Sequence, residues 1–173
     1  FKSVNGGGSW ATFNVGLTTN NILSLVIDPT GNNLHAGSNG NAVFDYTLAP
    51  AAFYTLTPCR VADTRNPAGP YGGPALAANA DRTFVIGGQC GIPSAATAVS
   101  FNFTVTQPAA LGDLRTVPGG GTLPLVSTMN WRPGQTRANN AIIPLGPSGD
   151  ILVHVDQASG TVHFIIDVNG YFQ

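Results

Sequence analysis

The sequence has no glutamate and a single lysine, Lys2, and charged residues make up only 9% of it. An average soluble domain is about 25% charged, and its helices carry glutamate and lysine on their exposed faces. The scarcity of both residue types therefore argues against a helical protein. The net charge of −1 also excludes the broad positive surface with which proteins bind nucleic acid or anionic membranes.

Long apolar runs are missing as well. No stretch approaches the roughly 18 residues of a membrane-spanning helix, so no membrane span is expected. The chain begins with Phe1 rather than methionine, and we expect it to be a processed product or a fragment.

The residues that are abundant favour strands and turns. The chain of 173 residues has 22 glycines, 13 prolines and 43% hydrophobic residues, with many Val, Ile, Thr and Phe. This composition predicts an all-β protein with many turns. The amino-acid composition changes at the small residues Thr47–Ala52. This change predicts a meander over residues 1–48 and a second domain over residues 53–173.

Short strands are predicted in the first segment over residues 22–27, 34–37 and 42–46, because each is apolar and bounded by turn residues. Upstream of them stands a more specific motif, Ser3-Val4-Asn5-Gly6-Gly7-Gly8-Ser9-Trp10. It resembles the Asp-box (BNR) repeat of β-propellers, with asparagine in the usual aspartate position.

This resemblance implies a structural hairpin turn and no catalysis. Asn5 would cap the turn, glycines such as Gly7 would adopt positive φ, and Trp10 would pack beneath. One blade cannot bury its own faces, and propellers need about four to eight blades. The exposed edges must therefore be covered by the rest of the chain, by a missing part of the protein, or by another copy.

The second segment shows a run of short apolar stretches between Gly- and Pro-rich turns. Residues 99–106 alternate cleanly, with apolar residues at the odd positions. This pattern predicts a β-sandwich or jelly-roll-like domain. Its strands are expected at residues 53–56, 82–86, 98–106, 113–117, 126–131, 140–144, 151–155 and 161–168.

The two cysteines, Cys59 and Cys90, suit one disulfide in an exported protein, with two buried free thiols as the alternative. They belong to an ordered set of motifs: Cys59–Arg65, Gly72–Pro74, Cys90–Pro93, Ala98–Val105, Ser127–Trp131, Gln135–Asn140 and Asp167–Phe172. This order resembles a β-rich accessory module at the C-termini of secreted bacterial multidomain proteins, including cell-wall hydrolases. The resemblance implies an extracellular location, a Cys59–Cys90 bridge and no catalytic activity.

The sequence gives little support for a catalytic or metal site. Without glutamate, a glycosidase would need an aspartate pair, for which Asp63 and Asp167 are the best placed. His154, Asp156 and His163 could approach one another on adjacent strands, but no short metal-ligand spacing accompanies them. We expect no catalytic residue, no metal and no cofactor.

The Asp63-Thr64-Arg65 cluster is the strongest polar feature of the sequence. It predicts a buried Asp–Arg network that locks the loop after Cys59, with a bidentate site for a carboxylate or for sugar hydroxyls as the alternative. Further candidate ligand-binding residues are Tyr71, Arg137 and Asn139, although asparagines near turns more often bond to backbone.

These observations favour a non-catalytic extracellular protein of the cell surface. The predicted function is that of a self-associating subunit of a surface assembly or filament, with residues 1–46 as the connecting segment. The alternative is a carbohydrate- or cell-wall-binding module of a secreted bacterial hydrolase.

Overall fold

The computed structural model describes residues 1, 8–13, 17–19, 21–29, 32–40, 43–47 and 51–173. These residues form strands, turns and loops; no helix occurs among them, and hence none that could cross a membrane. The all-β prediction is therefore confirmed for the described chain. It folds as two compact units, Phe1–Pro50 and Ala51–Gln173, and the boundary between them falls within the predicted linker Thr47–Ala52.

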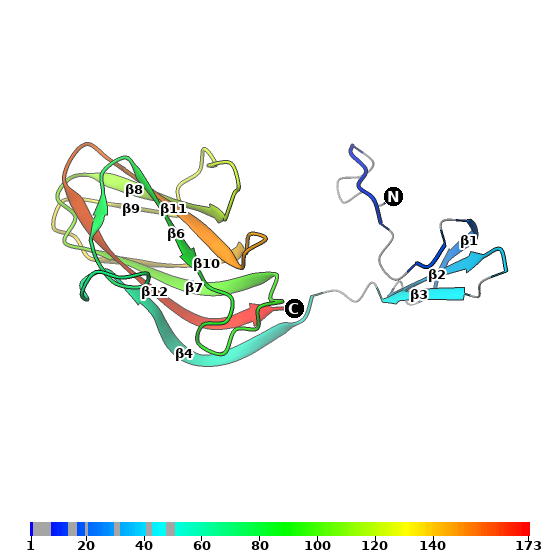
Figure 1. Ribbon diagram of the computed structural model, residues 1–173. Helices are drawn as coiled ribbons and strands as arrows, with labels where there is room; N and C mark the ends of the chain where they lie inside the picture. The colour runs from blue at the N-terminus through cyan, green and yellow to red at the C-terminus, as the bar shows by residue number, and fades with distance from the viewer. Residues whose placement is uncertain (2–7, 14–16, 20, 30–31, 41–42, 48–50) are drawn as a thin grey trace. The chain divides into compact units, whose positions relative to one another are not determined.

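The first unit is a three-stranded antiparallel sheet in the order β1-β2-β3 (Figure 1). Its strands are β1 Ile22–Ile27, β2 Asn33–Ser38 and β3 Val43–Thr47, within one residue of the predicted ranges. The predicted Asp-box residues Asn5 and Gly7 lie outside the described residues.

Asp28 fixes the connection between β1 and β2. Its backbone N–H donates to the carbonyl of Asn33 at 2.9 Å. Its Oδ1 accepts the backbone N–H of Asn32 at 3.0 Å, and its Oδ2 accepts the Asn33 side-chain amide at 2.8 Å. The aspartate side chain thus replaces backbone partners at the end of the strand, as the Asp-Pro turn signal predicts.

The first unit has no second layer among its described residues. Ala36 is the one buried hydrophobic residue there, whereas Leu23, Leu25 and Ile27 of β1 are all more than half exposed. Trp10 is 63% exposed, and the turn beneath which it was expected to pack lies outside the described residues. A single sheet of three strands offers the indole no opposing layer in which to be buried.

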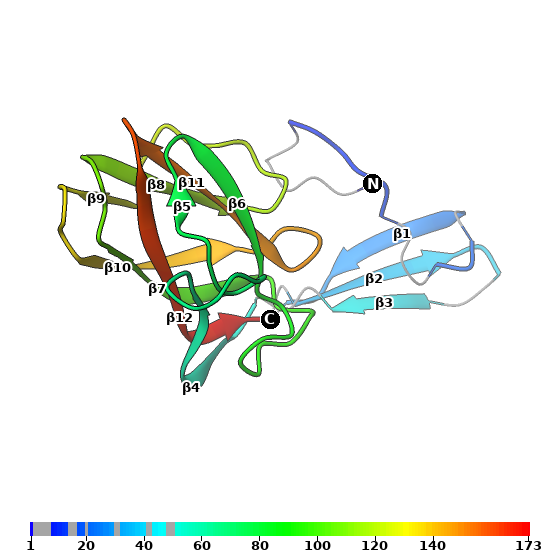
Figure 2. The same ribbon diagram turned by 60° about the vertical axis from the view of Figure 1, so that its left-hand side comes forward.

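Two antiparallel sheets form the second unit, in the orders β10-β7-β12-β4 and β6-β11-β8-β9, with the short strand β5 beside β12. They lie face to face in Figures 1 and 2. The strands are β4 Phe53–Asp63, β5 Leu76–Ala77, β6 Ala80–Val85, β7 Ala98–Thr106, β8 Gly112–Pro118, β9 Met129–Trp131, β10 Arg137–Pro144, β11 Asp150–Gln157 and β12 Thr161–Phe172.

The core lies between these sheets. Alternation in β7 buries the odd positions from Val99 to Val105 completely. From the facing sheet, Phe84 of β6 reaches Phe164 of β12 with ring centroids 6.0 Å apart. Side chains from both inner faces thus interdigitate, and the predicted β-sandwich is confirmed.

The structure corrects the sequence expectation in two places. The segment after Cys59, expected as a loop, continues β4 up to Asp63, so that strand is more than twice its predicted length. The two-residue strand β5 was not predicted. Both pair with β12, and such long-range partners leave no local signal in the sequence.

Cys59 and Cys90 form a disulfide, with their Cα atoms 5.9 Å apart. Cys59 lies in β4, and Cys90 lies in the loop between β6 and β7, in the left-handed region at φ 53°. Both side chains pack against the core. The bridge therefore fastens the longest edge strand of the sandwich to a loop that Ile92 anchors in the interior.

Removing this bridge is expected to destabilise the second unit strongly. The cysteines are 31 residues apart, and a loop of that length corresponds to about 3–4 kcal/mol in the chain-entropy model. Urea unfolding of the Cys59→Ser/Cys90→Ser double variant should show a loss of this size. Reducing agent should destabilise the wild type and leave the variant unchanged; two free thiols in native material would contradict the assignment.

Candidate functional site

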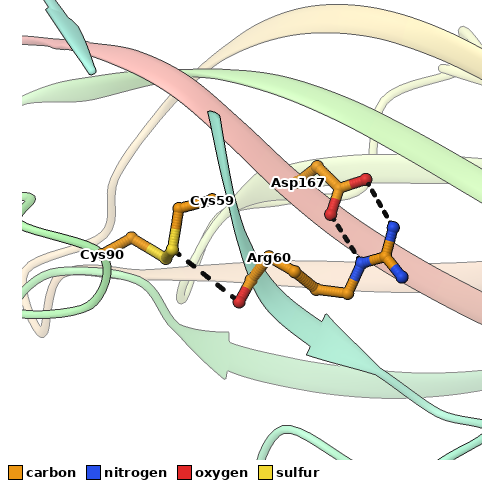
Figure 3. Close-up of a disulfide and its surroundings, with 4 residues drawn as sticks. All are labelled: Cys59, Arg60, Cys90 and Asp167. Carbon is orange, nitrogen blue, oxygen red and sulfur yellow. Dashed lines mark hydrogen bonds and ion pairs between the residues drawn. A yellow bond between two sulfur atoms is a disulfide. The ribbon is translucent and has the colours of Figure 1, made fainter. Parts of the chain in front are cut away.

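Four charged side chains form a continuous chain of ion pairs along β4 and β12. Asp63, which is 5% exposed, accepts hydrogen bonds from Arg65 Nε at 2.8 Å and from Arg65 Nη2 at 2.6 Å. Arg60 Nη1 reaches Asp63 Oδ2 at 3.3 Å. Arg60 also donates to both carboxylate oxygens of Asp167, from Nε at 2.8 Å and from Nη2 at 3.1 Å (Figure 3).

This arrangement is the buried Asp–Arg network, the first of the two interpretations of the Asp63-Thr64-Arg65 cluster. The neighbouring Thr64 strengthens it, because its hydroxyl accepts the backbone N–H of Phe164 at 2.8 Å and lies 3.2 Å from His163 Nδ1. The end of β4 is thereby fixed to β12 by both side chains and backbone.

Hydrogen bonds from the Arg65 guanidinium lower the pKa of Asp63 to about 2, despite the burial that opposes ionisation. The hydrogen bond to Asp167 raises the pKa of Arg60. A glycosidase needs one carboxyl group whose pKa is raised, so that it can act as an acid. Asp63 has the opposite environment, and the Asp63/Asp167 pair does not form such a centre.

A shallow, open groove of about 480 Å³ lies beside the Arg60–Asp167 pair. Its walls come from three neighbouring strands: Pro58, Cys59 and Arg60 of β4, Asn102 of β7, and Asp167, Val168 and Asn169 of β12. The alternation over residues 99–106 predicts that the even positions, Asn102 among them, face away from the core, and the structure agrees. Asn169 was not singled out.

A break in strand register lies beside the groove. Between Val168 and Gly170, the pairing of β12 shifts against both β4 and β7. Asn169 is therefore an unpaired residue in a bulge of a central strand, and its side chain is exposed. Bulges re-aim side chains and occur frequently beside binding sites.

The other candidate ligand residues are not brought together. Tyr71 is partly buried and packs against the core. Asn139 donates its amide to the carbonyl of Thr128 at 2.7 Å, which is a structural bond to a loop. Arg137 is exposed at the start of the edge strand β10, away from the groove residues.

The residues considered for a metal divide between the two sheets. His154 Nδ1 of β11 lies 2.6 Å from Asp81 Oδ1, and its Nε2 lies 3.4 Å from Asp156 Oδ1. His163 belongs to β12 in the opposite sheet. Asp156 also pairs with Arg115. Within the described residues, no group of three His, Cys or Asp side chains could hold a metal ion.

Arg82 is a structural residue that sequence reasoning missed. Its guanidinium donates to the carbonyls of Gly69, Gly72 and Pro74 at 2.7 to 2.9 Å and lies over the ring of Phe84. Prolines lack an N–H, so the Gly/Pro loop before β5 has more acceptors than donors. That excess was the available signal that a nearby arginine would supply the missing donors.

Comparison with known proteins identifies no family. No protein-family model matches the sequence, and no curated protein matches it. Among solved structures, the tobacco streak virus coat protein dimer is similar at 12% identity and a TM-score of 0.38, over 69% of this chain and 86% of that one. A second crystal form of this coat protein gives 12% identity and a TM-score of 0.34, with 69% and 85% coverage. Likenesses this distant indicate nothing about function.

We expect Asp63 to make stability depend on pH in the acid range. Its pKa falls from 3.8 to about 2 on folding, so its contribution is present above about pH 4 and is lost as the pH falls towards 2. Arg65 is half exposed, and solvent screening limits this contribution to about 1–2 kcal/mol. Chemical unfolding between pH 2 and 6 should show the loss in the wild type.

The Asp63→Asn variant should lack this part of the pH dependence. The control Asp81→Asn removes a carboxylate whose side chain is 54% exposed, and it should retain the loss. Equal acid dependence in the wild type and in Asp63→Asn would contradict the assignment.

The Arg82→Lys variant should loosen the loop of residues 66–74. A lysine ammonium cannot serve three carbonyls from one planar fork, and we expect a loss of about 1–3 kcal/mol. Limited proteolysis should also cut this loop faster. Arg132→Lys is the matched control, because no side-chain partner of Arg132 occurs among the described residues; equal effects would refute the role of Arg82.

Proposed function

We propose that this protein is a non-catalytic structural subunit outside the cell, which associates with further copies of itself through β1. The observation that carries this proposal is an apolar edge strand without charge or proline, on a sheet that has no second layer among the residues that the structure describes. The occupant of that edge is a second copy of the same chain.

β1 has the features of a strand that pairs with another chain. It is an edge strand of its sheet and contains neither a charge nor a proline. Leu23 and Leu25 are 68% and 65% exposed, and Val26, which points to the other face, is 59% exposed. An edge that is apolar on both faces exposes unpaired backbone groups together with a surface that water solvates poorly.

The edges of the second unit are protected, which makes the contrast informative. β4 carries Pro58 and Arg60, β10 carries Arg137 and Pro144, and β6 carries Asp81 and Arg82. The fourth edge, β9, is three residues long. Charges, prolines and short length are the devices by which sheet proteins avoid pairing with one another. The sequence applies them throughout the sandwich and omits them at β1.

The geometry of pairing determines the kind of assembly. Two β1 strands that pair antiparallel make a closed dimer with a continuous sheet. If β1 of one copy pairs instead with β3 of the next, the contact is heterologous and propagates into a filament. The mass of the assembly in solution distinguishes these arrangements.

Location and lack of catalysis are supported by the second unit. Disulfides persist in oxidising compartments, and the Cys59–Cys90 bridge is built into the core. The best-placed carboxylates, Asp63 and Asp167, are both held by arginines in structural ion pairs. A disulfide-bonded sandwich of low charge is suited to a durable role outside the cell.

A charge placed in the middle of β1 tests the proposal. Sedimentation velocity on the full chain should reveal oligomers whose mass grows with concentration. Leu25→Lys should shift the population to monomer, because pairing would bury the ammonium against an apolar strand. The matched control is Leu125→Lys, at a position that is 101% exposed in the second unit, and it should leave the assembly unchanged.

Deletion of residues 1–46 gives a second, independent readout. If β1 is the connector, the shortened chain should be a folded monomer with intact sandwich stability. The proposal is contradicted if the full chain stays monomeric at all concentrations and the shortened chain unfolds. The first segment would then complete the fold of its own chain and would not connect copies.

A further inference from the structure

The outer face of the sheet containing β4, β12 and β7 carries a row of polar side chains in register. Arg60 is paired with Asp167, and Asp167 is paired with Asn102. Directly paired residues of neighbouring strands project to the same face of a sheet. The groove of about 480 Å³ described above therefore lies across the strands, on the side opposite the core.

Two side-chain amides in this groove have unused hydrogen-bonding capacity. Asn102 is half-buried in the groove wall, and Asn169 projects from the bulge in β12. Neither side-chain amide has a hydrogen-bond partner within the part of the chain that the structure describes. Each amide can donate two hydrogen bonds and accept others, which matches a ligand that is both donor and acceptor.

The charges in the groove cancel each other. Arg60 uses Nε and Nη2 on Asp167 and Nη1 on Asp63, while both oxygens of Asp167 accept from Arg60. An anionic ligand would meet the Asp167 carboxylate, and a cationic ligand would meet the guanidinium. A neutral ligand that carries hydroxyl groups is the chemistry that this lining favours.

An aromatic ring lies on the same face, towards the C-terminal end of β12. Gly170 is paired with Ser100, two residues before Asn102 in β7, so it faces the same side. A Cβ at Gly170 would come within 2.3 Å of the Phe53 ring, which shows that this ring covers the glycine. Phe53 is 47% exposed and contacts Phe172 at a centroid distance of 4.9 Å.

Polar and aromatic parts are separated along β12 by the three steps from Asp167 to Gly170, or about 10 Å of strand. An extended chain of sugar rings could contact both at once, with hydroxyls on the amides and one ring face on Phe53. A bulge in a central strand costs ladder hydrogen bonds, and here it lies beside the groove, between these two parts.

We propose that this groove is a binding site for a neutral, linear polysaccharide, with Asn102, Asn169 and the Arg60–Asp167 pair contacting hydroxyls and Phe53 contacting a ring face. The site lies wholly in the second unit. It does not depend on self-association through β1, so the Leu25→Lys variant should bind sugar as the wild type does.

Isothermal titration calorimetry of the full chain tests this site with defined probes. Cellohexaose offers hydroxyls alone, and chitohexaose adds acetamido groups; saturable binding of either supports the site, and their ratio identifies the preferred class. Polygalacturonate and a Gly-Ser peptide test anionic and peptide ligands. Binding of one of these in place of both neutral oligosaccharides would overturn the proposal.

Variants with matched controls locate the binding. Asn102→Ala should weaken it about tenfold through the loss of paired hydrogen bonds, whereas Asn130→Ala, at an exposed position of β9 in the facing sheet, should not. Phe53→Ala should weaken binding, whereas Tyr54→Ala, equally exposed at 48% but on the opposite face, should not. Because Asn102 lies in a central strand, Asn169→Ala provides a second test at an exposed position.

Asparagine side-chain amide signals in an NMR titration complete the experiment. The signals of Asn102 and Asn169 should shift with added oligosaccharide, and that of Asn130 in the facing sheet should not. Equal losses in the site and control variants, shifts that leave Asn102 and Asn169 unaffected, or no binding by either oligosaccharide would each overturn the assignment.

Discussion

The antiparallel ladder between β7 and β12 is the interaction on which the second unit depends. It joins the two longest inward-facing apolar rows of the sheet, and it places Phe103 beside Phe164 at a centroid distance of 5.4 Å in the core. The same register sends Asn102 and Asp167 to the opposite face. One ladder thus determines both the interior and the polar row of the groove. A slip of one residue would exchange the two faces, so neither could change alone.

Scarcity of charge leaves few arginines, and four of the six in the second unit have a structural task. Arg60 and Arg65 hold carboxylates at the end of β4, Arg82 closes the Gly/Pro loop, and Arg115 pairs with Asp156 and the carbonyl of Pro124. These contacts are direct hydrogen bonds and ion pairs between neighbouring groups. They take the place of the surface charge networks that this sequence lacks. The electrostatics of the protein therefore act in fixing loops and strand ends rather than in long-range attraction of a partner.

The two units solve the problem of apolar surface in different ways. In the sandwich, each sheet covers the other, and the edge strands carry charges, prolines or few residues. In the first unit, β1 has apolar side chains on both faces and its described residues bury little. A sheet of three strands gains independent stability from a second hydrophobic layer or from further strands. The proposed association supplies strands, whereas the proposed sugar site needs only the rigid face of the sandwich.

Local pattern was enough to predict most of the strands, because alternation and turn residues act over short distances. The β7 range was predicted to the residue, since an apolar residue at each odd position is consistent only with one buried face. Pairing partners were not predictable in this way. The extension of β4 to Asp63 and the existence of β5 both depend on β12, which lies about a hundred residues downstream of the end of β4.

The sequence by itself determined the all-β class, the two-part organisation and the chemistry available in each motif, because composition and periodicity are properties of neighbouring residues. Tertiary structure alone decided which groups meet. It gave Asp63 its arginine partners and bonded Asn139 to a loop. It also packed the partly buried Tyr71 against the core and placed Asn169 in the wall of the groove. Each of these outcomes depends on strand register and on long-range packing, and a shift of one residue in a ladder changes them without changing any local pattern.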